Sequence, residues 1–336
     1  MATDAELAAM QRARELAVSV TLADGPNPRV GCVILSPDGR VLGEGAHHGA
    51  GTPHAEVAAL AAAGEEARGG TAVVSLEPCH HTGRTGPCTG ALLAAGIRRV
   101  VYGQDDPHAR AAGGSQALRA AGVDVEGDVE GDLAADLNRA WTFAVTRGRP
   151  FVTVKMAATL DGRVAAADGT SRWITGEDAR RDVHRLRSQC DAVLVGTATV
   201  ALDDPVLTVR DVTVPLGGQP LRVVVGRRDI PDGARILDGG AETLHLRTHD
   251  VGAVLSALTQ REIRHVLVEG GPTLVAAFFD AGSVDEVVWY VAPALLGSGP
   301  AALSDLGITT ISNVLRLRDV SVVQIGMDAR ISGRVV

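Results

Sequence analysis

The sequence lacks the features of a membrane-spanning, secreted or disulfide-stabilised protein. No apolar run approaches the ~18 residues of a membrane-spanning helix, and the first residues, MATDAELAAMQRARELA, are acidic and amphipathic rather than apolar like the core of a signal peptide. Four cysteines in 336 residues are too few for a disulfide scaffold. We therefore expect a soluble, cytoplasmic protein in which any clustered cysteines bind a metal or take part in catalysis.

An excess of basic charge is also absent. Lys and Arg total 32 against 40 Asp and Glu, for a formal net charge of −8. This balance disfavours a nucleic-acid-binding protein, which would neutralise phosphates with a basic face, and it disfavours an anionic membrane surface. Lysine occurs once, at Lys155, beside many arginines, a bias typical of a GC-rich genome. Neither a nucleic acid nor a membrane is therefore an expected partner.

The order of the predicted elements indicates an α/β protein of two domains. Helical and strand patterns alternate along the chain, and the 46% hydrophobic content suffices for two cores. Thr3 and Glu6 have capping-box spacing, and the turn 36–39 predicts a hairpin between runs 30–35 and 40–45. A polar, proline-marked break at 147–150 places the boundary near residue 148, which predicts domains 1–148 and 149–336.

The densest reactive cluster comprises His54, Glu56, Cys79 and Cys88. One imidazole and two thiolates make three zinc ligands and leave the fourth tetrahedral position for water, as in catalytic sites. Zinc lowers the pKa of bound water to about 7. Glu56, on the same predicted helix as His54, can reach that water as a proton shuttle. The pattern is typical of zinc-dependent nucleobase deaminases.

Two other interpretations of this cluster stay open at this point. The three ligands would also suit a structural zinc clamp, although a clamp needs no glutamate two residues after the histidine. His80 or His81 would close the site if either were a fourth ligand; otherwise both lie along the pocket mouth.

The second half has no G-x-G-x-x-G after its first strand, so the usual dinucleotide-binding fingerprint is missing. A weaker signal takes its place: the apolar strand 265–269 runs into Gly271-Pro272-Thr273 and a predicted helix. Glycine lets backbone N–H groups approach a phosphate, and a helix N-terminus favours an anion. A plain strand–helix turn is the alternative.

A family resemblance links the two halves. The cysteines at positions 79 and 88 are separated by eight residues, and this loop, with segments 27–33 and 45–47, closely resembles the deaminase half of the bifunctional riboflavin-biosynthesis deaminase–reductases. It departs from the family at His80, usually serine, and Gly86, usually proline. Reductase-like segments then follow in the family's order; they are 155–163, 171–175, 180–187, 195–200 and 203–210.

The resemblance implies a fold and a set of ligand-binding residues. The N-terminal domain would be a cytidine-deaminase-like three-layer α/β/α domain with a mixed sheet, and the C-terminal domain a dihydrofolate-reductase-like α/β domain. The residues implied to bind NADPH are Ala157, Trp173, Thr199, Asp203, Gly271, Pro272 and Thr273. Those implied to bind substrate are Asn27, His47, Ser171, Arg187, Leu207, Arg210 and Glu269.

Lys155 is expected to act in the reductase pocket. A lone lysine at the end of an apolar strand is poorly explained by surface solvation, and Glu269, at the carboxyl end of another strand, would face the same crevice. We therefore expect Lys155, as a catalytic residue, to hydrogen-bond the sugar of the substrate. Guanidinium groups at Arg187 and Arg210 suit its phosphate.

The function implied by the resemblance is bifunctional. A zinc-dependent domain would deaminate 2,5-diamino-6-ribosylamino-4(3H)-pyrimidinone 5′-phosphate, and an NADPH-dependent domain would reduce the ribosyl group to ribityl, giving 5-amino-6-(5-phosphoribitylamino)uracil. The family also favours a homo-oligomer built through the reductase domain. The alternatives are a cytidine- or tRNA-type deaminase with a non-catalytic C-terminal binding domain, and a zinc protein without turnover.

Overall fold

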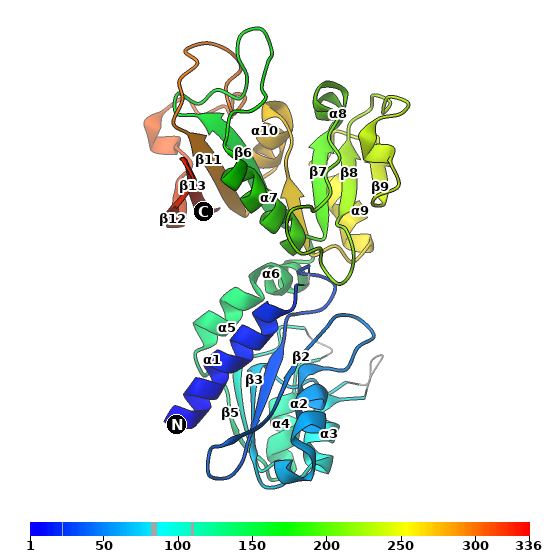
Figure 1. The fold of residues 1–336 in the computed structure, drawn as a ribbon, viewed down its shortest axis with the longest axis vertical. Helices are drawn as coiled ribbons and strands as arrows, with labels where there is room; N and C mark the ends of the chain where they lie inside the picture. The colour runs from blue at the N-terminus through cyan, green and yellow to red at the C-terminus, as the bar shows by residue number, and fades with distance from the viewer. Residues whose placement is uncertain (22, 82–85, 109–110) are drawn as a thin grey trace. The chain divides into compact units, whose positions relative to one another are not determined.

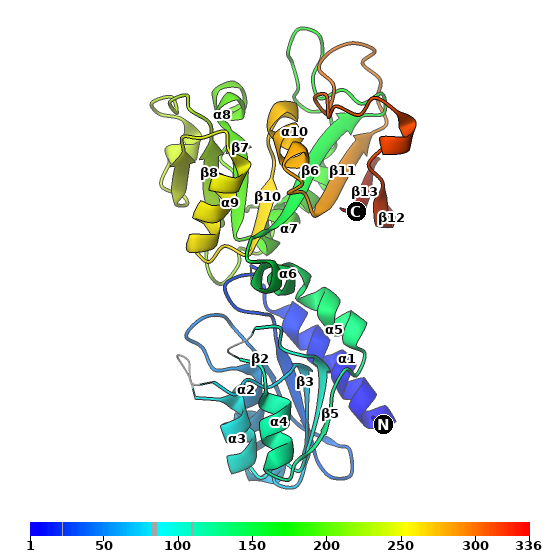
Figure 2. The ribbon, with the colours of Figure 1, turned by 180° about the vertical axis from the view of Figure 1, so that it is seen from behind.

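The computed structural model describes residues 1–336 except 22, 82–85 and 109–110. The chain divides into two compact units, Met1–Gly148 and Arg149–Val336 (Figures 1 and 2). In the described part of the chain, no helix combines the length and apolar character needed to span a membrane.

The first unit is built around a mixed sheet. Its strands have the order β2-β1-β3-β4-β5, with β1 antiparallel to β2 and β3, and β4 parallel to β3 and β5. The helices and strands are α1 (Asp4–Ser19), β1 (Gly31–Leu35), β2 (Val41–Ala46), α2 (Ala55–Ala63), η1 (Gly64–Ala67), β3 (Thr71–Leu76), α3 (Cys88–Ala94), β4 (Arg99–Gln104), α4 (Gly114–Ala120), β5 (Asp124–Glu126), α5 (Gly131–Leu137) and α6 (Arg139–Arg147).

The alternating side chains of β1 pack into a core on each face of the sheet, which makes three layers. Cys32 and Ile34 of β1 pack into the core under α2, α3 and α4, whereas Val33 and Leu35 pack against α1. Figures 1 and 2 show α1 and α5 together on one face and α2, α3 and α4 on the other. Because successive side chains of a strand point to opposite faces, a fully apolar strand must be covered on both sides. The expected α/β/α arrangement with a mixed sheet is confirmed.

Two local sequence signals of this unit are also confirmed. Thr3 Oγ1 accepts from the backbone N–H of Glu6, and the Glu6 carboxylate accepts from the N–H of Thr3, which completes the capping box of α1. The hairpin forms between β1 and β2, with Gly31 opposite Ala46.

The second unit contains a larger sheet with the order β12-β13-β11-β6-β10-β7-β8-β9. The six strands β11, β6, β10, β7, β8 and β9 run parallel to one another. At one edge, β13 pairs antiparallel with β11, and β12 pairs antiparallel with β13. The helices and strands are β6 (Phe151–Thr159), α7 (Glu177–Gln189), β7 (Ala192–Gly196), α8 (Thr197–Asp203), β8 (Leu221–Val225), η2 (Arg235–Leu237), β9 (Thr243–Leu246), α9 (Val251–Gln260), β10 (His265–Val268), α10 (Pro272–Asp280), β11 (Glu286–Ala292), η3 (Ile311–Asn313), β12 (Leu317–Ile325) and β13 (Asp328–Val335).

Helices cover both faces of this parallel sheet. On one face, α9 and α10 bury Val152, Val154 and Met156 of β6 (Figure 2). On the other, α7 packs on Val288 and Tyr290 of β11 (Figure 1). The carboxyl ends of the parallel strands therefore lie at one edge of the sheet, where α/β proteins bind ligands.

Candidate active sites

The three predicted metal ligands come from separate elements of the first unit and meet at one point. His54 is the residue before α2, Cys88 begins α3, and Cys79 follows β3. Their ligand atoms all lie within 4.8 Å of one another. His54 Nδ1 is 3.1 Å from Cys88 Sγ and 3.6 Å from Cys79 Sγ.

These distances suit zinc. A tetrahedral zinc with Zn–N and Zn–S bonds of about 2.0 and 2.3 Å holds its nitrogen and sulfur ligands roughly 3.5 Å apart. The donor set of one imidazole and two sulfurs is also the one that zinc prefers. The backbone N–H of Cys88 donates to Cys79 Sγ over 3.4 Å, and hydrogen bonding from Cys88 lowers the pKa of Cys79 to about 4, which favours the thiolate that a metal requires.

Glu56 lies beside these ligands in the first turn of α2 and is buried. Burial raises the pKa of its carboxyl group above the usual value. A carboxyl group whose pKa is raised towards neutrality both accepts and returns a proton readily. The position thus suits proton transfer beside the metal ligands.

Asn27 and His47 are brought together at the same site. His47 Nδ1 lies 3.2 Å from the carbonyl oxygen of Pro53, which can only accept, so this nitrogen carries the proton. His47 Nε2 then accepts from Asn27 Nδ2 at 3.0 Å. The rings of His47 and His54 make an edge contact with centroids 5.3 Å apart. Asn27 and His47, which were both expected to bind substrate, therefore lie next to the metal ligands although they are distant in sequence.

A pocket of about 480 Å³ opens beside His54. Its lining is Gly51, Pro53, His54, Val57, Gly86, Pro87, Gly90 and Ala91. Among the described residues, the metal-binding group consists of His54, Cys79 and Cys88. His80 Nδ1 lies 3.0 Å from Thr89 Oγ1 instead. Positions 82–85 of the insert between the cysteines lie outside the described residues.

Sequence reasoning missed the residues that hold this site in shape. Buried Glu77 accepts from the backbone N–H groups of Asp106 and Ser115. Asn138 exchanges two hydrogen bonds with the backbone of Arg29 and so fixes the segment that carries Asn27. Their partners lie 29 to 109 residues away along the chain, so no local spacing could have identified them.

The second candidate site centres on an ion pair in the other unit. Arg187 of α7 donates to both oxygens of Glu269, over 2.5 and 2.9 Å, and both side chains are largely buried. Burial alone would raise the pKa of Glu269, but Arg187 holds it below the usual value. Lys155 of β6 is half-buried, and burial lowers the pKa of its ammonium. Glu269 and Arg187 both act on its charge, so the three groups lie close together.

The loop after α8 contacts Arg187 of this group. Arg187 Nη1 also donates to the carbonyl of Thr208, which follows buried Leu207. Arg210 is exposed, and its backbone N–H donates to His184 Nδ1 over 3.4 Å. Burial, with the charges of Arg187 and Arg210, lowers the pKa of His184 to about 4. His184 is therefore neutral at pH 7 and lies close to the guanidinium groups of Arg187 and Arg210.

The predicted phosphate turn has the expected backbone form. Gly271 precedes α10, and Pro272 is its first residue. A side chain at Gly271 would lie 3.8 Å from Thr199 Oγ1, so the turn and Thr199 are neighbours. Thr273 in the first turn is exposed.

The remaining predicted residues lie on loops and strands around this region. Trp173 is 69% exposed, and the Arg180 guanidinium lies over its ring at 4.6 Å. The segment containing Ser171 and Trp173 is tied to Asp203 because Arg172 donates to the Asp203 carbonyl. Ala157, on β6, pairs with Tyr290 of β11.

Comparison with known proteins covers both units. Residues 3–104 match the cytidine and deoxycytidylate deaminase zinc-binding region, and residues 150–331 match the RibD C-terminal domain. The riboflavin biosynthesis protein RibD of Mycobacterium tuberculosis is 48% identical over 309 residues, which cover 91% of each chain. RibD of Escherichia coli is 40% identical over 354 residues, covering 95% of this chain and 96% of that protein.

Solved structures give the same result. RibD of Acinetobacter baumannii superposes with a TM-score of 0.92 at 40% identity, covering 99% of both chains. A diaminohydroxyphosphoribosylaminopyrimidine deaminase/5-amino-6-(5-phosphoribosylamino)uracil reductase from Thermotoga maritima has a TM-score of 0.88 at 33% identity over the same coverage. Because the C-terminal half matches the RibD C-terminal domain, the alternative of a deaminase joined to an unrelated binding domain is excluded. The chain therefore belongs to the RibD family of bifunctional riboflavin-biosynthesis enzymes, in which a zinc-dependent deaminase half precedes an NADPH-dependent reductase half.

Proposed function

We propose that residues 1–148 deaminate 2,5-diamino-6-ribosylamino-4(3H)-pyrimidinone 5′-phosphate and that residues 149–336 reduce the ribosyl group of the product. The observation that carries the first assignment is the convergence of His54, Cys79 and Cys88 within 4.8 Å, with buried Glu56 beside them. The second rests on the Arg187–Glu269 pair, in which Glu269 directly follows β10, and on Lys155 in the middle of the neighbouring strand β6, not at its end as the sequence suggested.

In the deaminase site, the three ligand residues hold zinc, which supplies the Lewis acidity that makes a water acidic near neutral pH. Glu56 accepts the proton of the attacking water and delivers it to the leaving ammonia. Asn27 binds the edge of the pyrimidine through its amide, and His47 orients that amide through the 3.0 Å hydrogen bond between them.

In the reductase site, bound NADPH would supply the hydride that reduces the ribosyl group. The Gly271–Thr273 turn, with Ala157, Trp173, Thr199 and Asp203, binds the dinucleotide. Arg187 and Arg210 bind the phosphorylated sugar, together with Ser171, Leu207 and Glu269. Lys155 donates a hydrogen bond to the sugar as it opens.

The net charge of −8 fits a small phosphorylated pyrimidine rather than a nucleic acid. We place the protein in the cytoplasm. Its four cysteines are buried thiols, a form that a reducing compartment preserves.

Two variants separate the half-reactions. Cys88→Ala removes a zinc ligand, so it abolishes ammonia release yet leaves NADPH oxidation on the deaminated substrate unchanged. Lys155→Met abolishes NADPH oxidation on the deaminated substrate and leaves ammonia release unchanged. If both variants lost both activities while remaining folded, the assignment of one reaction to each unit would be wrong.

We also propose a homo-oligomer built through the reductase unit, with a second copy of this chain seated on β12. This edge strand pairs with β13, and its apolar side chains Val320, Val322 and Val323 are 54%, 66% and 37% exposed. A long apolar edge strand invites pairing with another chain.

Sedimentation equilibrium tests this interface. Val322→Glu should dissociate the oligomer, whereas Val41→Glu, at a residue of the first unit that is 50% exposed, should not. A wild-type protein that is monomeric at micromolar concentration contradicts the proposal.

A further inference from the structure

Lys155 is the only lysine of the chain, and its ammonium has no carboxylate in direct contact. Among the residues that the structure describes, it makes neither a hydrogen bond nor an ion pair. Glu269, whose charge acts on it, is already bonded through both oxygens to Arg187. Another group must therefore support this cation in the crevice.

The group that faces it is an aromatic ring. Lys155 Nζ lies 5.9 Å from the centroid of the Tyr290 ring, within the range of a cation–π contact. Tyr290 lies on β11 and is completely buried. In the β6–β11 pairing, Tyr290 is opposite Ala157, two residues beyond Lys155 on the same face of the sheet. The negative face of the ring thus stabilises the ammonium without neutralising it.

A hydrogen bond from the hydroxyl group of Tyr290 holds its ring in place. Tyr290 Oη donates to Asp182 Oδ2 over 2.7 Å, and Arg330 Nη1 donates to the same oxygen over 2.8 Å. Asp182 is on α7 and Arg330 on β13, directly across from Tyr290. Burial and Asp182 raise the pKa of Tyr290, so it remains a neutral hydrogen-bond donor.

We propose that Tyr290 is a positioning residue for Lys155: its ring supports the ammonium, and Asp182 and Arg330 hold the ring. The proposal rests on the role of Lys155 in the reductase given above. The charged and titratable groups around Lys155 are Tyr290 on β11, Glu269 after β10, Arg187 and Asp182 on α7, and Arg330 on β13. Because Arg187 occupies Glu269, the ammonium stays available to the substrate.

The titration of Lys155 tests the contact directly. Protein grown with ¹³Cε-lysine gives one lysine resonance, since the chain has one lysine, and its shift follows protonation of Nζ. Tyr290→Leu should increase the acid dissociation constant of the ammonium about tenfold, because a desolvated cation–π contact is lost. Tyr290→Phe, which keeps the ring, should titrate close to wild type. An unchanged titration in Tyr290→Leu overturns the proposal.

A second measurement applies if Tyr290→Leu fails to fold. The chain has two tyrosines, so 3,5-difluorotyrosine in a Tyr102→Phe background labels Tyr290 alone and weakens the negative face of its ring. The acid dissociation constant of the Lys155 ammonium should again rise. The ¹⁹F chemical shift of Tyr290 should also change as Lys155 titrates, and this change should be absent in Lys155→Met. A ¹⁹F signal insensitive to Lys155→Met contradicts the contact. Reductase activity surviving in Lys155→Met would instead refute only the catalytic role of Lys155.

Discussion

Glu56 is expected to transfer protons beside the metal without binding it. It is buried beside the three metal ligands, yet it is not one of them. Glu56→Gln should therefore retain zinc, measured by metal analysis, while ammonia release falls by about 10²- to 10⁴-fold because proton transfer is lost. Glu65→Gln, on the exposed surface of the same unit, is the matched control. Loss of zinc in Glu56→Gln would contradict this role.

His184 makes the stability of the reductase unit depend on pH. Its pKa is lowered to about 4 in the folded protein by burial, Arg187 and Arg210, whereas the unfolded chain takes up a proton near pH 6.5. Its contribution to stability is therefore complete above pH 6.5 and is lost as the pH falls towards 4. In His184→Gln, the urea midpoint should fall less between pH 7 and pH 5 than in wild type. An equal fall in both proteins would show that His184 does not titrate in this way.

The side chains of the candidate metal site could be predicted to lie together, but those that support them could not. His54, Glu56, Cys79 and Cys88 were recognisable from residue type and spacing, and the structure brings their positions together. Tyr290 and Asp182 are 108 residues apart, and nothing at either position predicts the other. Support of this kind depends on tertiary contacts rather than on local sequence.

At the scale of elements, α2 reaches its position because β2 presents glycine to it. A Cβ at Gly45 would lie 2.3 Å from the Ala55 carbonyl oxygen and 2.5 Å from the Ala59 nitrogen. Gly45→Ala must therefore displace α2, and with it His54 and Glu56. We expect lower zinc content and lower deaminase activity with an unchanged reductase. Gly217→Ala, where a Cβ meets open space, should change neither. Full zinc occupancy in Gly45→Ala would show that α2 tolerates the shift.

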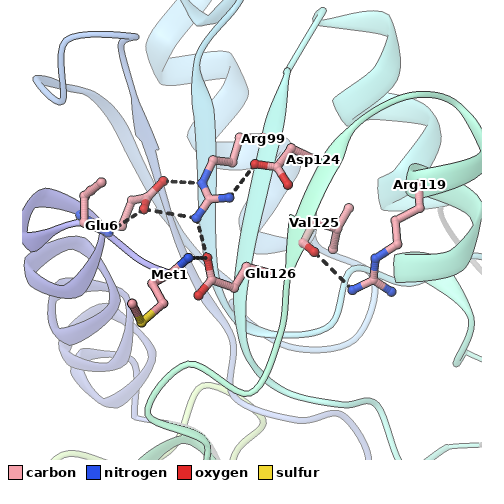
Figure 3. A network of polar contacts seen from close by, with 8 residues as sticks. Met1, Glu6, Arg99, Arg119, Asp124, Val125 and Glu126 are labelled. Atoms are coloured by element: carbon pink, nitrogen blue, oxygen red, sulfur yellow. Dashed lines mark hydrogen bonds and ion pairs between the residues drawn. The ribbon is translucent and has the colours of Figure 1, made fainter.

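Arg99 of β4 joins α1 to the far edge of the same sheet. Figure 3 shows its guanidinium between Glu6, Asp124 and Glu126, with the Met1 amino group also at Glu126. Glu6 is buried, so removal of Arg99 leaves a carboxylate poorly compensated.

We expect Arg99→Met to lower the free energy of unfolding of the first unit by about 1–2 kcal/mol, less than for a fully buried pair because Arg99 is partly exposed. The exposed Arg40–Glu66 pair supplies the control: Arg40→Met should cost less than ~0.5 kcal/mol. Urea unfolding measures both. Equal losses in the two variants would mean that the Arg99 network acts as an ordinary surface pair.

Elements with a strong local signal could be predicted, and those dependent on sheet context were missed. The capping box of α1 and the β1–β2 hairpin each follow from a few adjacent residues. The strand β9 and the antiparallel strand β13 were not anticipated. The first is a short sheet edge, and the second, DARISGRV, is rich in polar residues. Both are defined by the strand beside them more than by their own sequence.

At the scale of the whole molecule, the order of the two halves carried more information than either alone. Motifs of a deaminase followed by motifs of a reductase are collinear with relatives that match over more than nine-tenths of the chain. The reductase half offers no G-x-G-x-x-G fingerprint, so the residues expected to bind its cofactor follow from that resemblance and not from a local motif.

One measurement addresses the claim that a single chain performs both reactions. Purified, zinc-loaded protein is incubated with the diaminopyrimidinone ribose-phosphate and NADPH, and the products are analysed by mass spectrometry. If both units are active, the product will have exchanged an amino group for oxygen and gained two hydrogens. A product showing only the deamination change would contradict the reductase assignment of Lys155 and Glu269. Unchanged substrate in the presence of bound zinc would contradict the account as a whole.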